Sequence, residues 1–162
     1  MNLQTFNAAD DATARGTLDA CLDIDAWVDE LANGRPYPSW DALQASASEA
    51  SALISWDAVA TALARHPRIG EKATGTAADV KLSASEQAGV VSSQTDDLAA
   101  GNRAYEARFG HIFLICAAGL SGDQMLTALR HRMTNDPEPE KSVVISELRK
   151  IAHLRLAKAV TP

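Results

Sequence analysis

The sequence PEPEKSVVISELRKIAHLRLAK, residues 137–158, has the pattern of a long amphipathic helix. Prolines and acidic residues occupy its first turn, where a helix tolerates proline and favours negative charge. At about 100° per residue, one apolar stripe contains Val144, Ile145, Leu148, Ile151 and Ala152. The stripe predicts that this helix buries one face against other parts of the protein.

Arg155 falls within that stripe, whereas Glu147, Lys150 and His153 fall outside it. An arginine on an apolar face needs a partner, because an unpaired buried charge is costly. A protein carboxylate would serve, and so would an anionic or urea-like ligand, which suits the planar guanidinium. The pattern leaves both partners open.

Upstream of this helix, the sequence is rich in alanine and modest in β-branched residues, which favours further helices. The predicted helices cover residues 8–21, 25–32, 40–52, 56–65, 84–93, 96–109 and 122–135. The residues expected to cap their first turns are Asn7, Ser39, Ser55, Ser83 and Ser121. Gly34 and Gly110 are expected to end helices, Gly34 through the left-handed conformation.

Residues 111–119, HIFLICAAG, are the most apolar stretch of the chain. Their length suits a buried strand or a buried helix, and periodicity does not separate the two. Because helices surround this stretch, we expect the start of a buried helix or an extended connector rather than a lone strand.

His66 is the first candidate for chemistry. It continues the three-to-four-residue spacing of Trp56, Val59 and Leu63, and Pro67 disfavours helix at His66 itself. An inward-facing histidine at the end of a helix can line a pocket, or it can simply bond to a neighbouring carbonyl. The local pattern by itself favours the second, structural interpretation.

Glu86 is the second candidate, in the segment Ser83-Ala84-Ser85-Glu86-Gln87. Ser83-x-x-Glu86 matches a capping box, so the carboxylate has a structural use at the start of a helix. This structural role is a strong one, but the local pattern does not separate it from a catalytic role, and Glu86 can serve both. An imidazole, a carboxylate, a hydroxyl and an amide together would suffice for proton transfer on a small polar substrate.

The composition excludes several classes of function. With 162 residues and a net charge of −6, the chain fits one domain and lacks the basic field that nucleic acid requires. No apolar run reaches transmembrane length, and neither a signal peptide nor a peroxisomal tripeptide is present, so we expect a cytoplasmic protein. Its two cysteines and four histidines have no metal-ligand spacing, and no nucleotide or cofactor motif occurs, so we expect neither metal nor cofactor.

The order of motifs resembles the 2-oxo-4-hydroxy-4-carboxy-5-ureidoimidazoline (OHCU) decarboxylases of urate degradation. The similarity covers nearly the whole chain, and although each motif is weak, all of them in this order are specific. The matching segments are Phe6-Asn7-Ala8, Trp27, Arg35-Pro36-Tyr37, His66-Pro67-Arg68-Ile69-Gly70, Ser83-x-x-Glu86-Gln87-Ala88-Gly89, Asn102-x-x-Tyr105-x-x-Arg108-Phe109-Gly110, Phe113-Leu114-Ile115-Cys116-Ala117, Arg132-Met133-Thr134-Asn135-Asp136 and Ile151-Ala152-His153-Leu154-Arg155-Leu156.

The resemblance implies an all-α fold, a single-domain bundle of about eight helices over residues 1–162. It also implies a homodimer and a cofactor-free decarboxylation of OHCU to (S)-allantoin. The catalytic pair of the family matches His66 and Glu86 here. The substrate-binding positions of the family match Pro67, Ser83, Gln87, Phe113, Ile115 and Arg155.

Three departures from the family pattern bear on the shape of the pocket. Arg68 stands where the family often has aspartate, His111-Ile112 stands where Phe-Pro is common, and the chain is shorter after Gln87 than many relatives. Two other functions stay open on the residues alone. One is hydrolysis of a cyclic ureide by the same acid–base pair, and the other is a non-enzymatic helical interaction module.

Overall fold

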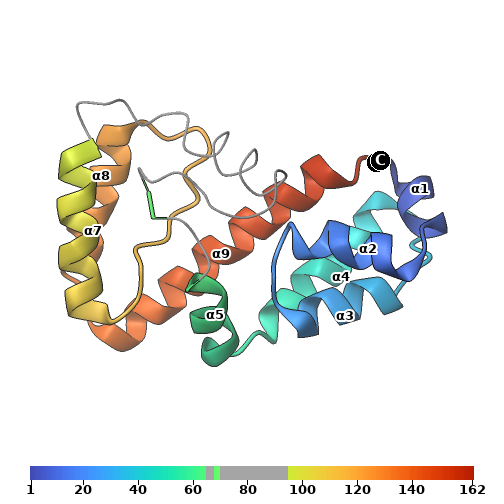
Figure 1. Ribbon diagram of the computed structural model, residues 1–162, viewed down its shortest axis with the longest axis horizontal. Helices are drawn as coiled ribbons and strands as arrows, with labels where there is room; N and C mark the ends of the chain where they lie inside the picture. The colour runs from blue at the N-terminus through green and yellow to red at the C-terminus, as the bar shows by residue number, and fades with distance from the viewer. Residues whose placement is uncertain (65–67, 70–94) are drawn as a thin grey trace. The chain divides into compact units, whose positions relative to one another are not determined.

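The computed structural model describes residues 1–64, 68–69 and 95–162. This part of the chain is all-helical, as the resemblance implied, and contains no strand beyond one isolated bridge (Figure 1). Its eight helices are α1 (Leu3–Ala8), α2 (Asp11–Asp19), α3 (Asp25–Asn33), α4 (Trp40–Ala52), α5 (Trp56–Leu63), α7 (Thr95–Phe109), α8 (Gly122–Arg132) and α9 (Pro137–Ala159). The predicted helix over residues 84–93 lies outside the described residues.

The helices group into two compact units. Unit 1 comprises Met1–Val59 and Arg149–Pro162, and unit 2 comprises Ala60–Leu148. The boundaries fall within helices, so α9 contributes its first half to unit 2 and its second half to unit 1.

In unit 1, α2 packs on α3 and α3 on α4. The interior contains fully buried Phe6, Leu31, Leu43 and Leu156, and the indole of Trp27 donates a hydrogen bond of 3.1 Å to the carbonyl of Ala47. Burial of large apolar and aromatic side chains is the main force that stabilises such a cluster. A polar N–H within it must find an acceptor, and Trp27 does.

The two ends of the chain are joined by backbone hydrogen bonds within unit 1. Leu3 N donates to Thr161 O at 2.8 Å, and Thr161 N donates to Met1 O at 2.9 Å. The terminal ammonium of Met1 donates to Ala159 O at 2.7 Å. The last of these bonds satisfies the carbonyl of Ala159, one of the C-terminal carbonyls that α9 itself leaves without a partner.

The prediction that Asn7 caps a helix over residues 8–21 is wrong. Asn7 lies inside α1, and its amide donates to Tyr37 O at 2.8 Å and accepts from Tyr37 N at 2.9 Å. Asn2 caps α1, and Asp10 caps α2 by accepting from Thr13 N at 2.7 Å. A distant backbone segment therefore binds the Asn7 amide in place of the local helix N–H groups.

Gly34 ends α3 as predicted, but its conformation is not left-handed, because its φ is −72°. A Cβ at this position would lie close to the hydroxyl oxygen and ring of Tyr37. Glycine is needed here for the close approach of Tyr37, whose hydroxyl donates to Leu31 O at 3.1 Å. Gly110, which ends α7, does have the left-handed conformation, with φ of 76°.

In unit 2, α7 and α8 lie side by side (Figure 1). Ser121 and Gln124 form the predicted capping box at the start of α8. The connector between the two helices covers residues 110–121. Its central part, residues 112–117, contains no helical turn, and five of these six residues are buried. Of the two structures expected for this apolar stretch, the extended connector is the one that forms.

The predicted apolar stripe of α9 is confirmed at four of its five residues, and the fifth, Ile145, is only partly buried. Val144, Leu148, Ile151 and Ala152 are buried, and Arg155 is buried with them, 6% exposed. The helix runs over Pro137–Ala159, one residue beyond the predicted end.

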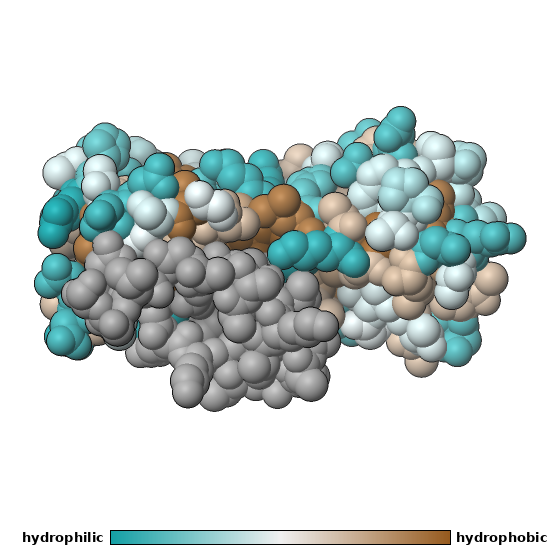
Figure 2. All heavy atoms as spheres, turned by 90° about the horizontal axis from the view of Figure 1, so that it is seen from above, coloured by the Kyte–Doolittle hydropathy of each residue, from teal (hydrophilic) through white to brown (hydrophobic). Residues whose placement is uncertain are grey.

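Most of the described surface seen in Figure 2 is hydrophilic or near neutral, as expected of a chain with this charge content.

Candidate functional site

Five of the predicted site residues, His66, Pro67, Ser83, Glu86 and Gln87, lie outside the described residues. The structure describes the other three. Phe113 and Ile115 belong to unit 2, and Arg155 belongs to unit 1. The predicted roles of all eight residues stay predictions.

Arg68 and Ile69, which directly follow His66-Pro67, are fixed to α7. The guanidinium of Arg68 donates from Nε to Glu106 Oε1 at 2.5 Å and from Nη2 to Glu106 Oε2 at 2.9 Å. These hydrogen bonds hold the pKa of the Glu106 carboxyl below its usual value. Arg68, which departs from the family pattern, therefore forms an ion pair with Glu106 in this chain.

Ile69 is anchored by both its backbone and its side chain. Asn102 Nδ2 donates to Ile69 O at 3.0 Å, and the Ile69 side chain joins an apolar cluster with Leu98, Tyr105 and Phe113. Asn102 is 2% exposed, and among the described residues no donor reaches its Oδ1. The segment that follows the predicted proton carrier is therefore built into the same core as the α7–α8 connector.

Phe113 and Ile115 lie within the buried part of the connector and are 1% and 8% exposed. The ring of Phe113 meets the ring of Tyr105 edge to face, with centroids 5.3 Å apart. The two predicted substrate-binding residues of this segment are therefore held in one packed cluster.

The sequence interpretation missed a buried charge network beside the connector. Arg132 donates from Nε to Glu140 Oε1 at 2.7 Å and from Nη1 to Leu114 O at 2.5 Å. Tyr105 donates its hydroxyl hydrogen to Glu140 Oε1 and accepts from Arg132 Nη2 at 3.2 Å. The other oxygen of Glu140 accepts from Asn135 Nδ2 at 2.6 Å. Burial and the Glu140 carboxylate both raise the pKa of Tyr105, so its hydroxyl stays protonated.

Arg132 is both ion-paired and buried, with its side chain 7% exposed. A sequence signal for it exists. Arg132 follows buried Met125 and Leu129 at helical spacing, and Glu140 precedes Val144 and Leu148 in the same way. The test that singled out Arg155 would therefore have flagged both residues, with opposite charges.

Arg155 lies near Cys21 within unit 1. Burial raises the pKa of the Cys21 thiol to about 12, and the positive charge of Arg155 opposes that rise without cancelling it. Both cysteines of the chain are free thiols. Cys21 is therefore a protonated, apolar neighbour of Arg155 at neutral pH.

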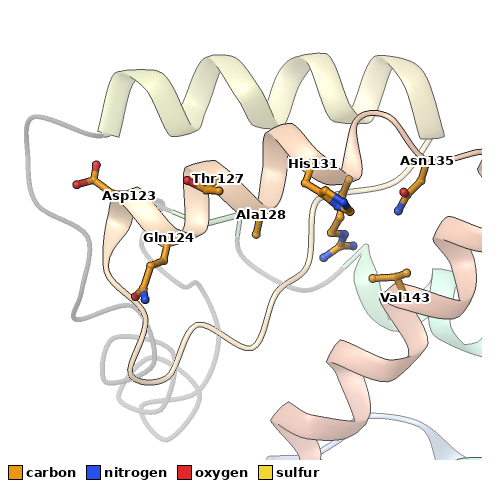
Figure 3. Close-up of a pocket in the computed structure, with 8 residues that line it drawn as sticks. Asp123, Gln124, Thr127, Ala128, His131, Asn135 and Val143 are labelled. Carbon is orange, nitrogen blue, oxygen red and sulfur yellow. The ribbon is translucent and has the colours of Figure 1, made fainter.

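A groove of about 640 Å³ lies along α8. Figure 3 shows Asp123, Thr127 and His131 along α8, with Val143 on α9. Of the predicted site residues that the structure describes, Phe113, Ile115 and Arg155, none lines this groove.

Within the described ranges, no three His, Cys, Asp or Glu side chains gather as metal ligands would. No helix in the same ranges is long and apolar enough to cross a membrane.

The fold is that of a known class of all-helical enzymes. A crystal structure of OHCU decarboxylase in the presence of (S)-allantoin is 27% identical, with a TM-score of 0.72 and coverage of 93% of this chain and 97% of that chain. A crystal structure of (S)-allantoin synthase, at 19% identity, has a TM-score of 0.73 and covers 99% of this chain and 54% of its own, which shows the fold alone.

The sequence model of OHCU decarboxylase matches residues 7–157, so the chain belongs to the OHCU decarboxylase family. Membership identifies it as a carbon–carbon lyase of the carboxy-lyase class, as the motifs predicted.

Among curated relatives, the 2-oxo-4-hydroxy-4-carboxy-5-ureidoimidazoline decarboxylase of Haloferax volcanii is 27% identical over 98% of this chain and 95% of its own length. The same-named protein of Amia calva is 31% identical over 76% of this chain and 74% of its own length. The uric acid degradation bifunctional protein TTL of Arabidopsis thaliana is 37% identical over 60% of this chain. That match spans about a third of the bifunctional protein, 32% of its length.

Proposed function

We propose that this protein decarboxylates OHCU to (S)-allantoin in urate degradation, without a cofactor. The observation that carries the proposal is the family match over residues 7–157, together with the similarity to the Haloferax decarboxylase over nearly the full length of both chains.

The substrate itself explains how the reaction proceeds without a cofactor. Its carboxylate and a hydroxyl share one carbon, next to the carbon of a C=N bond. As the bond to the carboxylate breaks and CO₂ leaves, the electron pair forms a new carbon–carbon double bond, and the C=N pair moves onto nitrogen, which takes a proton. The resulting enol then gains a proton on the ureido carbon and loses its hydroxyl proton. Delivery of that proton to one face fixes the S configuration.

In this proposal His66 carries the proton, because the unperturbed pKa of imidazole lies near neutrality. Glu86 orients the imidazole or holds an N–H of the ring. Arg155 and Gln87 anchor the oxygen-rich ureido-imidazolinone through complementary hydrogen bonds. Pro67, Ser83, Phe113 and Ile115 complete the pocket. Support for the Arg155 role is its burial on the apolar face of α9.

The proposal also includes one functional domain over residues 1–162, assembled as a cytoplasmic homodimer. The family match extends through both compact units, which supports treating them as one catalytic domain. Light scattering coupled to size-exclusion chromatography would measure the assembly state directly.

The test of the function is the decay of freshly made OHCU, generated in situ from urate and followed by ultraviolet absorbance and circular dichroism. We expect rapid decay to optically active allantoin, unchanged by a chelator, with one CO₂ released per turnover. Decay at the spontaneous rate to racemic product would overturn the proposal. Ring opening without CO₂ release would instead indicate a cyclic ureide hydrolase.

The catalytic pair is tested by His66→Ala and Glu86→Ala. We expect each variant to lose at least about a hundredfold in stereospecific turnover, the usual worth of a positioned acid or base, while its far-ultraviolet circular dichroism stays unchanged. Exposed His131 and Glu138 offer matched controls, and His131→Ala and Glu138→Ala should keep wild-type rates. A near-wild-type rate in either catalytic variant would remove that residue from the mechanism.

A further inference from the structure

The connector between α7 and α8 is hydrogen-bonded along one edge by charged side chains. Arg132 Nη1 donates to Leu114 O at 2.5 Å, and Glu147 Oε2 accepts from Cys116 N at 2.8 Å. In an extended chain, the carbonyl of one residue and the N–H of the residue two positions later point to the same side. Arg132 and Glu147 therefore occupy the place that a neighbouring strand takes in a sheet.

The backbone N–H and C=O groups of Phe113 and Ile115 point to the opposite edge of the connector. Among the described residues, none donates to or accepts from the backbone of either residue. Buried backbone groups almost always have partners, because leaving one without a hydrogen bond is costly. A polar ligand with both N–H and C=O groups, such as a ureido-imidazolinone, would satisfy an edge of this kind.

Arg132 holds the connector through more than one contact. Its guanidinium also lies over the ring of Phe113, 4.6 Å from the centroid, while Glu140 and Tyr105 hold the guanidinium itself. The position of Phe113 and the direction of the Leu114 carbonyl are thus set by the same group. Lysine would not reproduce this arrangement, because it lacks the planar fork of donors.

We propose that Arg132 and Glu147 are positioning residues for substrate binding, which fix one edge of the connector so that the backbone of Phe113 and Ile115 faces the substrate. This inference rests on the proposed function. It assigns a role in the reaction to two charged residues that need not touch the substrate.

Glu147 offers the cleaner test, because its side chain is half-buried and the network around Glu140 stays intact without it. We expect Glu147→Ala to raise the KM for OHCU about tenfold and to leave kcat within about twofold. A purely structural loss would reduce the fraction of active protein, and so the maximal rate, but would not move KM. Glu147→Gln should restore KM to within about twofold of wild type, because the amide oxygen still accepts from Cys116 N.

Tyr105→Phe is the second variant, in case Glu147→Ala does not fold. It removes only the hydroxyl, which donates to Glu140 and accepts from Arg132, and it keeps the ring that packs on Phe113. We expect its KM to rise about threefold at unchanged kcat. Glu138→Ala on α9 is the matched control, because Glu138 is exposed and pairs only with Lys141 among the described residues, so its KM should equal that of wild type.

Hydrogen exchange of the backbone amides over residues 112–117 separates the possible failures. Faster exchange together with a raised KM in Glu147→Ala would support the inference. Faster exchange with an unchanged KM, in an active protein, would overturn the inference and leave the proposed function standing. Absence of turnover by the wild-type protein would overturn both.

Discussion

Glu140 carries a charge that is fully removed from solvent. Its side chain has no exposed surface, and Arg132, Tyr105 and Asn135 hold its two oxygens. Glu140→Gln keeps the size of the side chain but leaves the Arg132 guanidinium without its ion partner. Removing one partner of a buried ion pair typically costs about 3–5 kcal/mol, and we expect a loss near the lower limit because the amide oxygen still accepts. Urea-induced unfolding would measure it.

Glu138→Gln is the control for that measurement. Glu138 pairs with Lys141 at 2.6 Å, but its side chain is 79% exposed. Exposed ion pairs contribute at most about 1 kcal/mol. Equal losses in the two variants would show that the buried network contributes no more than a surface pair.

Because of Cys21, we expect the free energy of unfolding to depend on pH in the alkaline range. Burial raises the pKa of its thiol from 9.0 to about 12, so the unfolded chain loses this proton at a lower pH than the folded one. The stabilisation that the protonated thiol contributes to the folded state is fully present below pH 9 and is lost as the pH rises from 9 toward 12. We expect the unfolding free energy of wild type relative to Cys21→Ala to fall by about 1 kcal/mol per pH unit above pH 9.

Urea unfolding at pH 8, 9 and 10 of wild type, Cys21→Ala and Cys116→Ala would test this pH dependence. Cys116→Ala keeps the buried thiol and should follow the wild-type curve. A constant difference between wild type and Cys21→Ala across this range would mean that the thiol ionises as readily in the folded protein as in the unfolded chain.

At the scale of elements, α7 anchors the segment that follows the predicted catalytic histidine. The Arg68–Glu106 pair is partly exposed, with side chains 43% and 26% accessible, so its contribution to stability should stay below about 1 kcal/mol. Its effect on activity should be larger, because small displacements of a catalytic group are costly. We expect Arg68→Glu and Glu106→Arg each to lower kcat/KM about fivefold to tenfold.

The double variant, with both charges exchanged, should recover most of that loss, because the ion pair forms again in the reverse sense. The exchanged Glu138–Lys141 pair on α9 serves as the control and should leave kcat/KM unchanged. A double variant as slow as the worse single variant would show that this ion pair does not position the segment.

Three helix starts were predictable from the sequence because a serine caps each of them locally. Ser39, Ser55 and Ser121 each accept from a backbone N–H three residues later, as their spacing indicated. Asn7 failed as a cap because Tyr37, thirty residues away, binds its amide. Local sequence does not reveal such a partner, so tertiary contacts decide those positions.

For the molecule as a whole, periodicity predicted the buried face of α9, including Arg155, and the order of motifs predicted the family. Neither revealed the network of Tyr105, Arg132 and Glu140, because its members come from three helices and form one cluster only in the folded chain. The predicted pocket is likewise assembled from residues far apart in sequence. Composition and spacing therefore suggest which residues are buried or functional, while the packing of the folded chain determines which partner each side chain contacts.

The hydrogen bonds of Met1 and Leu3 with Thr161 bring the two ends of the chain side by side, so the backbone of the chain is almost a closed ring. In such a ring the place where the chain is cut matters little to the packing of the core. A short linker between the present ends would permit new ends elsewhere, for example beside Leu53, which is 87% exposed between α4 and α5. The fold thus lends itself to circular permutation.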